Sequence, residues 1–321
     1  MSSVTAAAAE TSPLYRPEAT TAAGRVRRRL TSRTASVVSI IIAVLWTIPT
    51  FGLFVSSFRP EEQIKTTGWW TFFSHPQLTL QNYNDVVFGQ SSSQGQMASY
   101  FINSLAITIP AVIFSVSLAA MAAYALSWLD FKGRDWIFIG IFALQIVPLQ
   151  MALVPLLKLF SDGFSIGGAQ IIPAVSGDTP STAFVQVWIA HTCFGLPLSV
   201  FLLHNFMAEL PRDLFEAARV DGAGPAMIFR RIVLPLITPA LASVTIFQFL
   251  WIWNDLLVAL TFTQSDNAPL TVRLAQLAGT RGNEWQRLTS GAFVAMLLPI
   301  IVFLSLQRYF VRGLLAGGVK G

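Results

Sequence analysis

Long apolar runs separated by short polar segments dominate the pattern of this chain. A helix needs about 20 residues to cross the hydrocarbon core of a bilayer, and six runs reach that length. Each run contains a proline, which membrane helices tolerate because neighbouring groups pair with the freed carbonyl. The pattern predicts an all-α membrane protein with six transmembrane helices: Val37–Ser57, Ile102–Ser127, Trp136–Leu157, Phe184–Asn205, Leu236–Phe262 and Leu288–Leu306.

Composition supports this prediction. Of the 321 residues, 54% are hydrophobic and 12% are charged, and the mean hydropathy is +0.60. A soluble globular protein carries about twice that charged fraction. The single cysteine, Cys193, excludes a disulfide framework and a cysteine-based metal cluster. The net charge of +5 needs no nucleic-acid partner to explain it. Residues 1–34 are rich in Ala, Thr and Ser, and we expect them to form a disordered cytoplasmic tail.

Lys and Arg concentrate in alternate segments between the runs, and cytoplasmic segments of membrane proteins carry this excess. We therefore predict that both termini and the loop 206–235 face the cytoplasm. The cytoplasmic residues are Arg16, Arg25, Arg27, Arg28, Arg29, Arg33, Lys132, Arg134, Arg212, Arg219, Arg230, Arg231, Arg308, Arg312 and Lys320. The external residues are Arg59, Lys65, Lys158, Arg273, Arg281 and Arg287.

The loop 206–235 predicts two short helices joined by a turn. Residues 213–220 can form the first helix, and Gly222 and Gly224 allow a turn with positive φ. Pro225 suits the first position of the second helix. On the first helix, four residues are expected near one face, flanked by Glu216 and Arg219: Leu214, Ala217, Ala218 and Asp221. The two small alanines beside a carboxylate make a surface that another protein can approach closely.

Glu216-Ala217-Ala218, the following Gly222 and the later Ile232, Leu234 and Pro235 resemble the EAA loop of ABC-importer permeases. The resemblance implies a coupling helix held in a cleft of a separate ATP-hydrolysing subunit. Its ATPase-coupling residues would be Leu214, Phe215, Glu216, Ala217, Ala218, Asp221 and Gly222.

Phe101–Leu105, Ala122–Leu126 and Phe131–Arg134 resemble the second-span region of carbohydrate permeases, and Trp253–Asp255 resembles their fifth-span signature. The ending Leu306–Gly313, closing in Gly317–Gly321, is similar to the MalG-type half of maltose-like importers. Within that group, Gly279–Trp285 most resembles α-glucoside permeases. The resemblance implies the type I ABC-importer permease fold. It divides the chain into a first helix with a long external loop (35–100), a permease core (101–312) and a cytoplasmic C-terminal tail (313–321).

The same resemblance implies the assembly and its place in a bacterial cell membrane. The partners would be a second, MalF-like permease, two ATPase subunits that bind ATP and Mg, an extracytoplasmic sugar-binding protein and membrane lipid. This chain would bind no cofactor or metal, and it would be a translocation subunit rather than an enzyme. The sequence has no Gly-x-x-x-x-Gly-Lys-Ser/Thr phosphate loop and no evident catalytic set, in keeping with that role.

The fifth run holds the candidate substrate path. On one continuous helix Gln248, Trp251 and Asp255 would share a face, with Asn254 beside them. An aromatic ring beside amide and carboxylate groups suits a sugar, whose C–H faces stack while its hydroxyls form hydrogen bonds. A helix–helix hydrogen-bond cluster is the alternative. His191, in the fourth run, is expected to be a packed, hydrogen-bonded side chain.

Three other functions remain open from the sequence. An importer for glycerol phosphate, amino acids or peptides would have the same coupling loop. An ion-coupled secondary transporter would need intramembrane ionisable groups, and Asp255 is the only carboxylate within a run. A membrane-embedded enzyme would need catalytic residues, for which the sequence offers no candidates.

Overall fold

The computed structural model describes residues 33–89, 96–175, 177, 179–279 and 283–318. The chain divides into two units, Met1–Val55 and Ser56–Gly321, which are described separately. The first unit holds α2 (Arg33–Ser57), an apolar helix long enough to cross a membrane. Residues 1–32 of the predicted tail lie outside the described residues.

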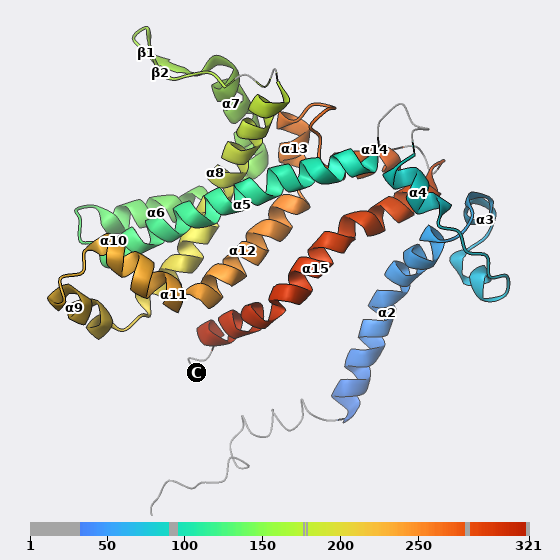
Figure 1. Ribbon diagram of the computed structural model, residues 1–321, viewed down its shortest axis with the longest axis horizontal. Helices are drawn as coiled ribbons and strands as arrows, with labels where there is room; N and C mark the ends of the chain where they lie inside the picture. Colours follow the sequence, from blue (N-terminus) through green and yellow to red (C-terminus); the bar gives the residue numbers. More distant parts are fainter. Residues whose placement is uncertain (1–32, 90–95, 176, 178, 280–282, 319–321) are drawn as a thin grey trace, which may run out of the picture. The chain divides into compact units, whose positions relative to one another are not determined.

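The second unit is almost entirely helical, and its two strands form one hairpin (Figure 1). Its longest helices are α5 (Met97–Trp128), α8 (Pro180–Ala208) and α15 (Trp285–Gly318). The shorter elements before α8 are α3 (Glu61–Thr66), the 3-10 helix η2 (Trp69–Phe73), α4 (Gln81–Val87), α6 (Arg134–Leu144), α7 (Leu149–Asp162), β1 (Phe164–Ile166) and β2 (Ala169–Ile172). Those after it are α9 (Arg212–Val220), α10 (Pro225–Ile228), the π-helical turn η3 (Phe229–Val233), α11 (Leu234–Leu236), α12 (Thr238–Trp253), α13 (Leu257–Phe262) and α14 (Leu270–Ala278).

Four of the predicted spans are continuous helices, and two are not. The described residues contain four membrane-length helices, or up to six spans if each bent helix pair counts as one. The predicted span Trp136–Leu157 crosses a 103° bend between α6 and α7, where Pro148 precedes α7. The predicted span Leu236–Phe262 also fails as a single helix. Its main helix, α12, ends at Trp253, and a 77° bend separates α12 from the segment before it.

Two hydrophobic clusters hold the second unit together. The first joins the N-terminal half of α5 to α8, α12, α13 and α14. The second joins the C-terminal half of α5 to α8, α9, α10 and α12. Its α5 surface includes three small residues, Ala119, Ala120 and Ala123, which let helix backbones approach closely. The helix α9 is therefore part of the core of this unit.

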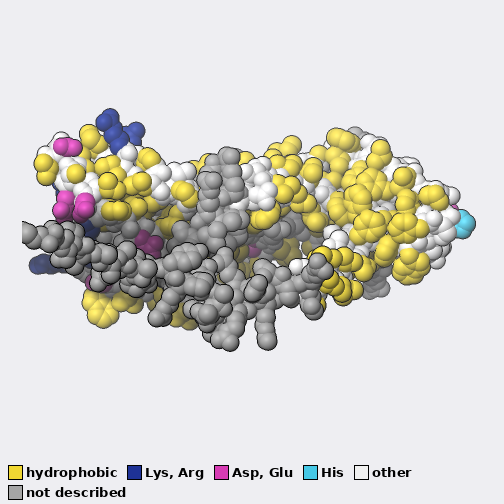
Figure 2. Space-filling view, turned by 90° about the horizontal axis from the view of Figure 1, so that it is seen from below, with side chains coloured by type: hydrophobic (Ala, Val, Ile, Leu, Met, Phe, Trp, Pro, Cys, Tyr) yellow, Lys and Arg dark blue, Asp and Glu magenta, His cyan; other side chains and the backbone are white. Residues whose placement is uncertain are grey.

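The surface of the second unit suits a membrane protein. Many large hydrophobic side chains are exposed, among them Trp136 and Ile146, each about four-fifths exposed. Charged side chains gather at the end of the unit that holds α9 and α10 (Figure 2). This charged end matches the polar loop 206–235 of the sequence.

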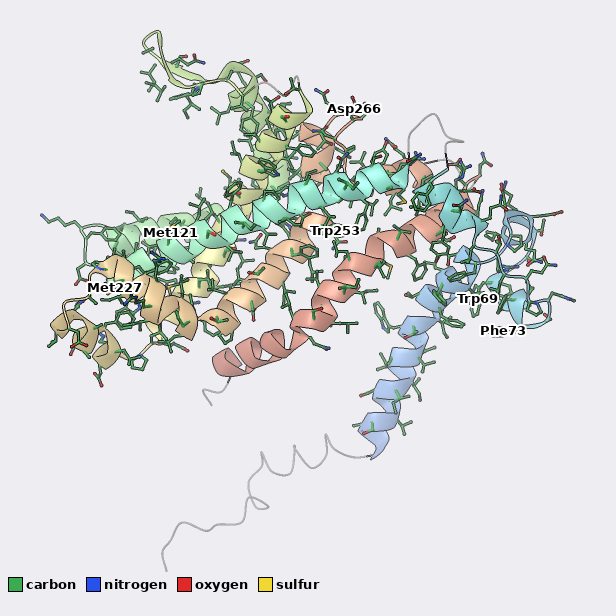
Figure 3. The ribbon with its side chains drawn as sticks, in the orientation of Figure 1. Trp69, Phe73, Met121, Met227, Trp253 and Asp266 are labelled. Carbon is green, nitrogen blue, oxygen red and sulfur yellow. The ribbon has the colours of Figure 1, made fainter. Side chains whose placement is uncertain are left out.

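Hydrogen bonds join two segments predicted to be external to the ends of neighbouring predicted spans. Asn103 donates to the carbonyls of Asp266 and Ala268, each at 3.1 Å, and Ser290 donates to the carbonyl of Asn82 at 3.3 Å. Figure 3 shows Asp266 beside the end of α5 that is remote from α10. These hydrogen bonds hold the segments at that end of the unit together.

A buried arginine organises the cap that precedes α5. Arg59 is 1% exposed and donates to the hydroxyls of Thr67 at 2.5 Å and Thr71 at 3.1 Å. Burial lowers the pKa of its guanidinium from the ordinary value. In the 3-10 helix η2, the aromatic rings of Trp69 and Phe73 meet edge to face with their centroids 6.4 Å apart (Figure 3). The aromatic residues of η2 are thus packed on one another.

Gly195 allows α5, α8 and α12 to meet, and we expect Gly195→Val to destabilise the bundle. A Cβ atom at this position would lie 2.6 Å from Oε1 of Gln248 and 3.0 Å from Oγ of Ser115. Overpacking of this kind costs about 1–3 kcal/mol. The thermal unfolding temperature in detergent should fall, whereas Gly140→Val should cause a smaller change because that site is open. Equal effects of the two variants would contradict this account.

Candidate functional sites

The helix α9 and its turn form as the local sequence predicts. The helix covers Arg212–Val220 and follows Pro211, and Asp213 lies in its first turn, where a negative charge is favourable. Gly222 then adopts φ +82°, a left-handed conformation that glycine accepts without strain. Gly224 has an ordinary negative φ, so only one of the two glycines is needed for the turn. α10 begins at Pro225, as predicted.

One face of α9 is anchored in the bundle. Phe215 is 2% exposed, and its ring stacks on Trp128 at the end of α5 with centroids 3.6 Å apart. The Trp128 indole donates to the carbonyl of Met207 in α8 at 2.9 Å. Ala218 is buried on the same face. The stack therefore joins α9 to both long helices.

Phe215 and Ala218 belong to the predicted coupling set, and the structure buries both of them. Both were expected to contact an ATPase, but in this structure they face the core of their own chain. This nine-residue helix has apolar residues on both sides, so its sequence alone does not show which side is buried. The contact with Trp128 decides it. The exposed members of the predicted set are Leu214, Glu216, Ala217, Asp221 and Gly222, and the strongly exposed Val220 joins them.

The segment after the turn is also attached to α5. The hydroxyl of Tyr124 in α5 donates to the carbonyl of Pro225 at 3.0 Å, and its ring lies 5.1 Å from that of Phe229. The π-helical turn η3 follows and leads through α11 into α12. A displacement of α9 can therefore reach α5, α8 and α12 through direct contacts.

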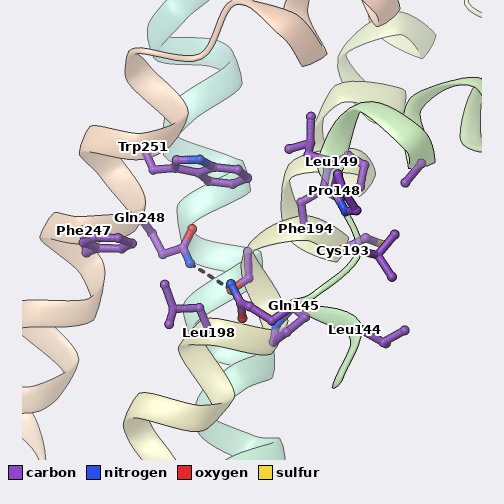
Figure 4. A pocket seen from close by; sticks show the side chains of 14 residues that line it. Leu144, Gln145, Pro148, Leu149, Cys193, Phe194, Leu198, Phe247, Gln248 and Trp251 are labelled. Atoms are coloured by element: carbon purple, nitrogen blue, oxygen red, sulfur yellow. Dashed lines mark hydrogen bonds between the residues drawn. The ribbon is translucent and has the colours of Figure 1, made fainter. Parts of the chain in front are cut away.

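Two of the predicted substrate-path residues line a pocket of about 530 Å³. Gln248 and Trp251 of α12 face residues of α8, Cys193 and Phe194, across this pocket (Figure 4). The break between α6 and α7 closes a third side. The remaining lining residues are Leu144, Gln145, Val147, Pro148, Leu149, Ala152, Gly195, Pro197, Leu198 and Phe247.

Asn254 and Asp255 do not line this pocket, and the predicted face does not extend to them because α12 ends at Trp253. Asn254 is exposed and donates back to the carbonyl of Leu250 at 2.7 Å. A carboxylate oxygen of Asp255 accepts from the backbone N–H of Ala259 at 3.1 Å, so it caps the first turn of α13. Both residues thus satisfy backbone groups at the break.

His191 is packed, as expected, but it is less well hydrogen-bonded than predicted. Its Nε2 lies 3.8 Å from Oδ2 of Asp255, beyond hydrogen-bond length, and its Nδ1 has no hydrogen-bond partner among the described residues. The ring meets Trp251 edge to face at 5.6 Å. His191 therefore supports the wall of the pocket formed by Trp251. Among the described residues, no group of three His, Cys, Asp or Glu could hold a metal ion.

Residues 115–315 match the family of binding-protein-dependent transport system inner membrane components. The chain belongs to this family. The resemblance to ABC-importer permeases deduced from the loop 206–235 is thereby confirmed. The permease is a membrane component of a transport system, in keeping with its apolar helices.

Two relatives of this permease are 46% identical to it. One is the osmoprotective compounds uptake permease protein GgtD of Synechocystis, with 88% of this chain and 90% of the relative covered. The other is the alpha-glucoside transport system permease protein AglG of Rhizobium meliloti, with 83% of this chain and 67% of the relative covered.

The fold is similar to a crystal structure of a bacterial ABC transporter involved in the import of the acidic polysaccharide alginate. The TM-score is 0.63 at 20% identity, with 87% of this chain and 98% of that chain covered. The predicted importer-permease fold is confirmed by this likeness together with the family match.

Proposed function

We propose that this permease is one of two different membrane subunits of an ATP-driven sugar importer, and that it carries small α-glucosides. The observation that supports a coupling role is the division of α9 into two faces. Phe215 and Ala218 fix the helix to the bundle, and Leu214, Glu216 and Ala217 remain exposed for a partner. The name of the relative AglG supports the sugar class.

The mechanism follows from these contacts. ATP, bound with Mg by two partner ATPase subunits, closes those subunits and moves α9 on the cytoplasmic side. The stack of Phe215 on Trp128 transmits the displacement to α5 and α8, and the hydrogen bond from Tyr124 to Pro225 moves α10 with them. The two permeases then rock between inward- and outward-open states. A binding protein delivers the sugar from outside, and this chain makes and breaks no covalent bonds.

A second candidate is an importer of osmoprotective compounds, because the relative GgtD is as similar as AglG. Glycerol phosphate, amino acids and peptides have less support. The pocket of the preceding section has no charged lining residue, which disfavours ionic solutes.

Uptake by the complete transporter in liposomes tests the proposal. The permease is reconstituted with its partner permease, ATPases and binding protein, and uptake of labelled maltose is measured. We expect uptake to require ATP, to compete with other α-glucosides and to be unaffected by glycine betaine or glycerol 3-phosphate. Uptake driven by a proton or sodium gradient without ATP would refute the proposal. Accumulation of glycine betaine in place of sugar would support the second candidate function, import of osmoprotective compounds.

A further inference from the structure

The segment Pro225–Leu236, which contains α10, η3 and α11, runs close to the membrane plane. Its axis makes an angle of 77° with α12 (Figure 1). α12 belongs to a candidate membrane span, and membrane-spanning helices tilt by about 20° from the bilayer normal on average. A segment almost perpendicular to such a helix therefore lies nearly flat. It joins α12 at the end predicted to be cytoplasmic, which places it at the cytoplasmic surface of the bilayer.

One side of this segment is fixed to the bundle. Ile228 and Val233 are buried in the second hydrophobic cluster. The ring of Phe229 packs on that of Tyr124, whose hydroxyl donates to the carbonyl of Pro225. These contacts decide which side chains of the segment face away from the protein.

The exposed side carries two arginines between apolar side chains. Arg230 and Arg231 are both exposed, and neither forms an ion pair with a carboxylate in the described part of the chain. Met227 and Leu236 are each 47% exposed. Segments that lie in a membrane interface combine these two kinds of side chain, because the apolar groups enter the acyl region while the cations stay at the level of the phosphates.

A bilayer supplies the complementary charge. Anionic phospholipids give the cytoplasmic surface of a membrane a negative potential, which attracts Lys and Arg close to it. The planar guanidinium of arginine also matches a phosphate group through two parallel hydrogen bonds. The apolar neighbours favour lipid over the surface of a water-soluble ATPase subunit, because a bilayer covers both kinds of side chain at once.

We propose that Arg230 and Arg231 bind the phosphate groups of anionic phospholipids in the cytoplasmic leaflet and hold the cytoplasmic end of α12 at the membrane surface. A displacement of α9 then changes the tilt of α12 instead of shifting the whole loop 206–235. The lipid contact is independent of the transported solute, and only its effect on coupling rests on the proposed function.

Photo-cross-linking to lipid tests the contact directly. The assembled transporter is placed in liposomes of phosphatidylcholine and phosphatidylglycerol, with a diazirine near the headgroup of one lipid or the other. Cross-links to residues 225–236 are located by mass spectrometry. We expect the phosphatidylglycerol probe to label this segment severalfold more than the phosphatidylcholine probe. Equal labelling by the two probes, or none, would overturn the proposal.

Matched variants assign the preference to the two arginines. In the double variant Arg230→Gln/Arg231→Gln, the two probes should label equally. Lys132→Gln, at an exposed position in the other turn predicted to be cytoplasmic, should keep the wild-type preference. Arg230→Lys/Arg231→Lys should also keep it, because lysine retains the charge. The ATPase should still co-purify with the glutamine variant, and its loss would show that the arginines bind that subunit instead of lipid.

Uptake of labelled maltose tests the effect on coupling. Wild-type uptake per ATP hydrolysed should be severalfold higher with phosphatidylglycerol than in phosphatidylcholine alone, and the glutamine variant should show the lower value in both. Equal wild-type uptake in the two lipids would show that the contact takes no part in coupling. If the transporter carries no sugar in either lipid, the proposed function fails, whereas the cross-linking result still decides the lipid contact.

Discussion

Replacing Glu216 with lysine is expected to abolish ATP-dependent uptake while the permease still folds and inserts. Glu216 is exposed on α9, and the residues that anchor this helix lie on its other face. The substitution therefore leaves the core of the chain intact and reverses a charge at the proposed ATPase contact. Disrupting a charge pair at an interface costs about 2–5 kcal/mol, which corresponds to binding weakened about thirtyfold or more.

Two measurements on purified membranes check this expectation. Uptake of labelled maltose should fall to background, and the ATPase should no longer co-purify with the permease. Asp130→Lys is the matched control, since it reverses a fully exposed carboxylate in the other turn predicted to be cytoplasmic. That variant should transport normally. Wild-type uptake and intact co-purification with Glu216→Lys would show that α9 is not the coupling helix.

Local signals made the helix α9 predictable. A run of helix-forming residues, a glycine with no Cβ at the turn and a proline at the next helix start act within a few residues of one another. Positive φ at Gly222 and the start of α10 at Pro225 follow from them directly. Neither depends on distant parts of the chain.

The buried side of α9 could not be predicted in this way. Phe215 and Leu214 are neighbours of similar hydrophobicity, and only the position of Trp128 decides between them. The ring of Trp128, at the far end of α5 in the sequence, stacks on Phe215. A contact between side chains of two separate helices cannot be predicted from the local sequence of either helix.

The sequence identified only two lining residues of the pocket, Gln248 and Trp251, because it did not show where the helices end or bend. Counting along a continuous helix placed Asp255 beside Gln248, but the helix ends at Trp253. Gln145 and Cys193 reach the pocket because α6 and α7 bend by 103° beside α8. A proline within an apolar run is compatible with a slight kink or a full break, so Pro148 alone did not reveal the bend. A glutamine shortly before that proline was the available clue.

Truncating Phe215 to alanine is expected to cause the largest loss of stability in the loop 206–235. The side chain is 2% exposed and stacks on Trp128, and removing a buried phenylalanine costs about 3–5 kcal/mol. The thermal unfolding temperature in detergent should fall clearly. Leu214→Ala, at the neighbouring exposed position, should leave it almost unchanged and instead weaken ATPase binding.

A double-mutant cycle separates the stack from a general packing defect. Because Phe215 and Trp128 contact each other, their alanine variants remove the same interaction, and the double variant should lose less stability than the sum of the single losses. ATP hydrolysis by the assembled Phe215→Ala transporter should also continue with little sugar uptake, because α9 can move without displacing α5. Additive losses of stability, or uptake that stays proportional to ATP hydrolysis, would show that force reaches the bundle by another route.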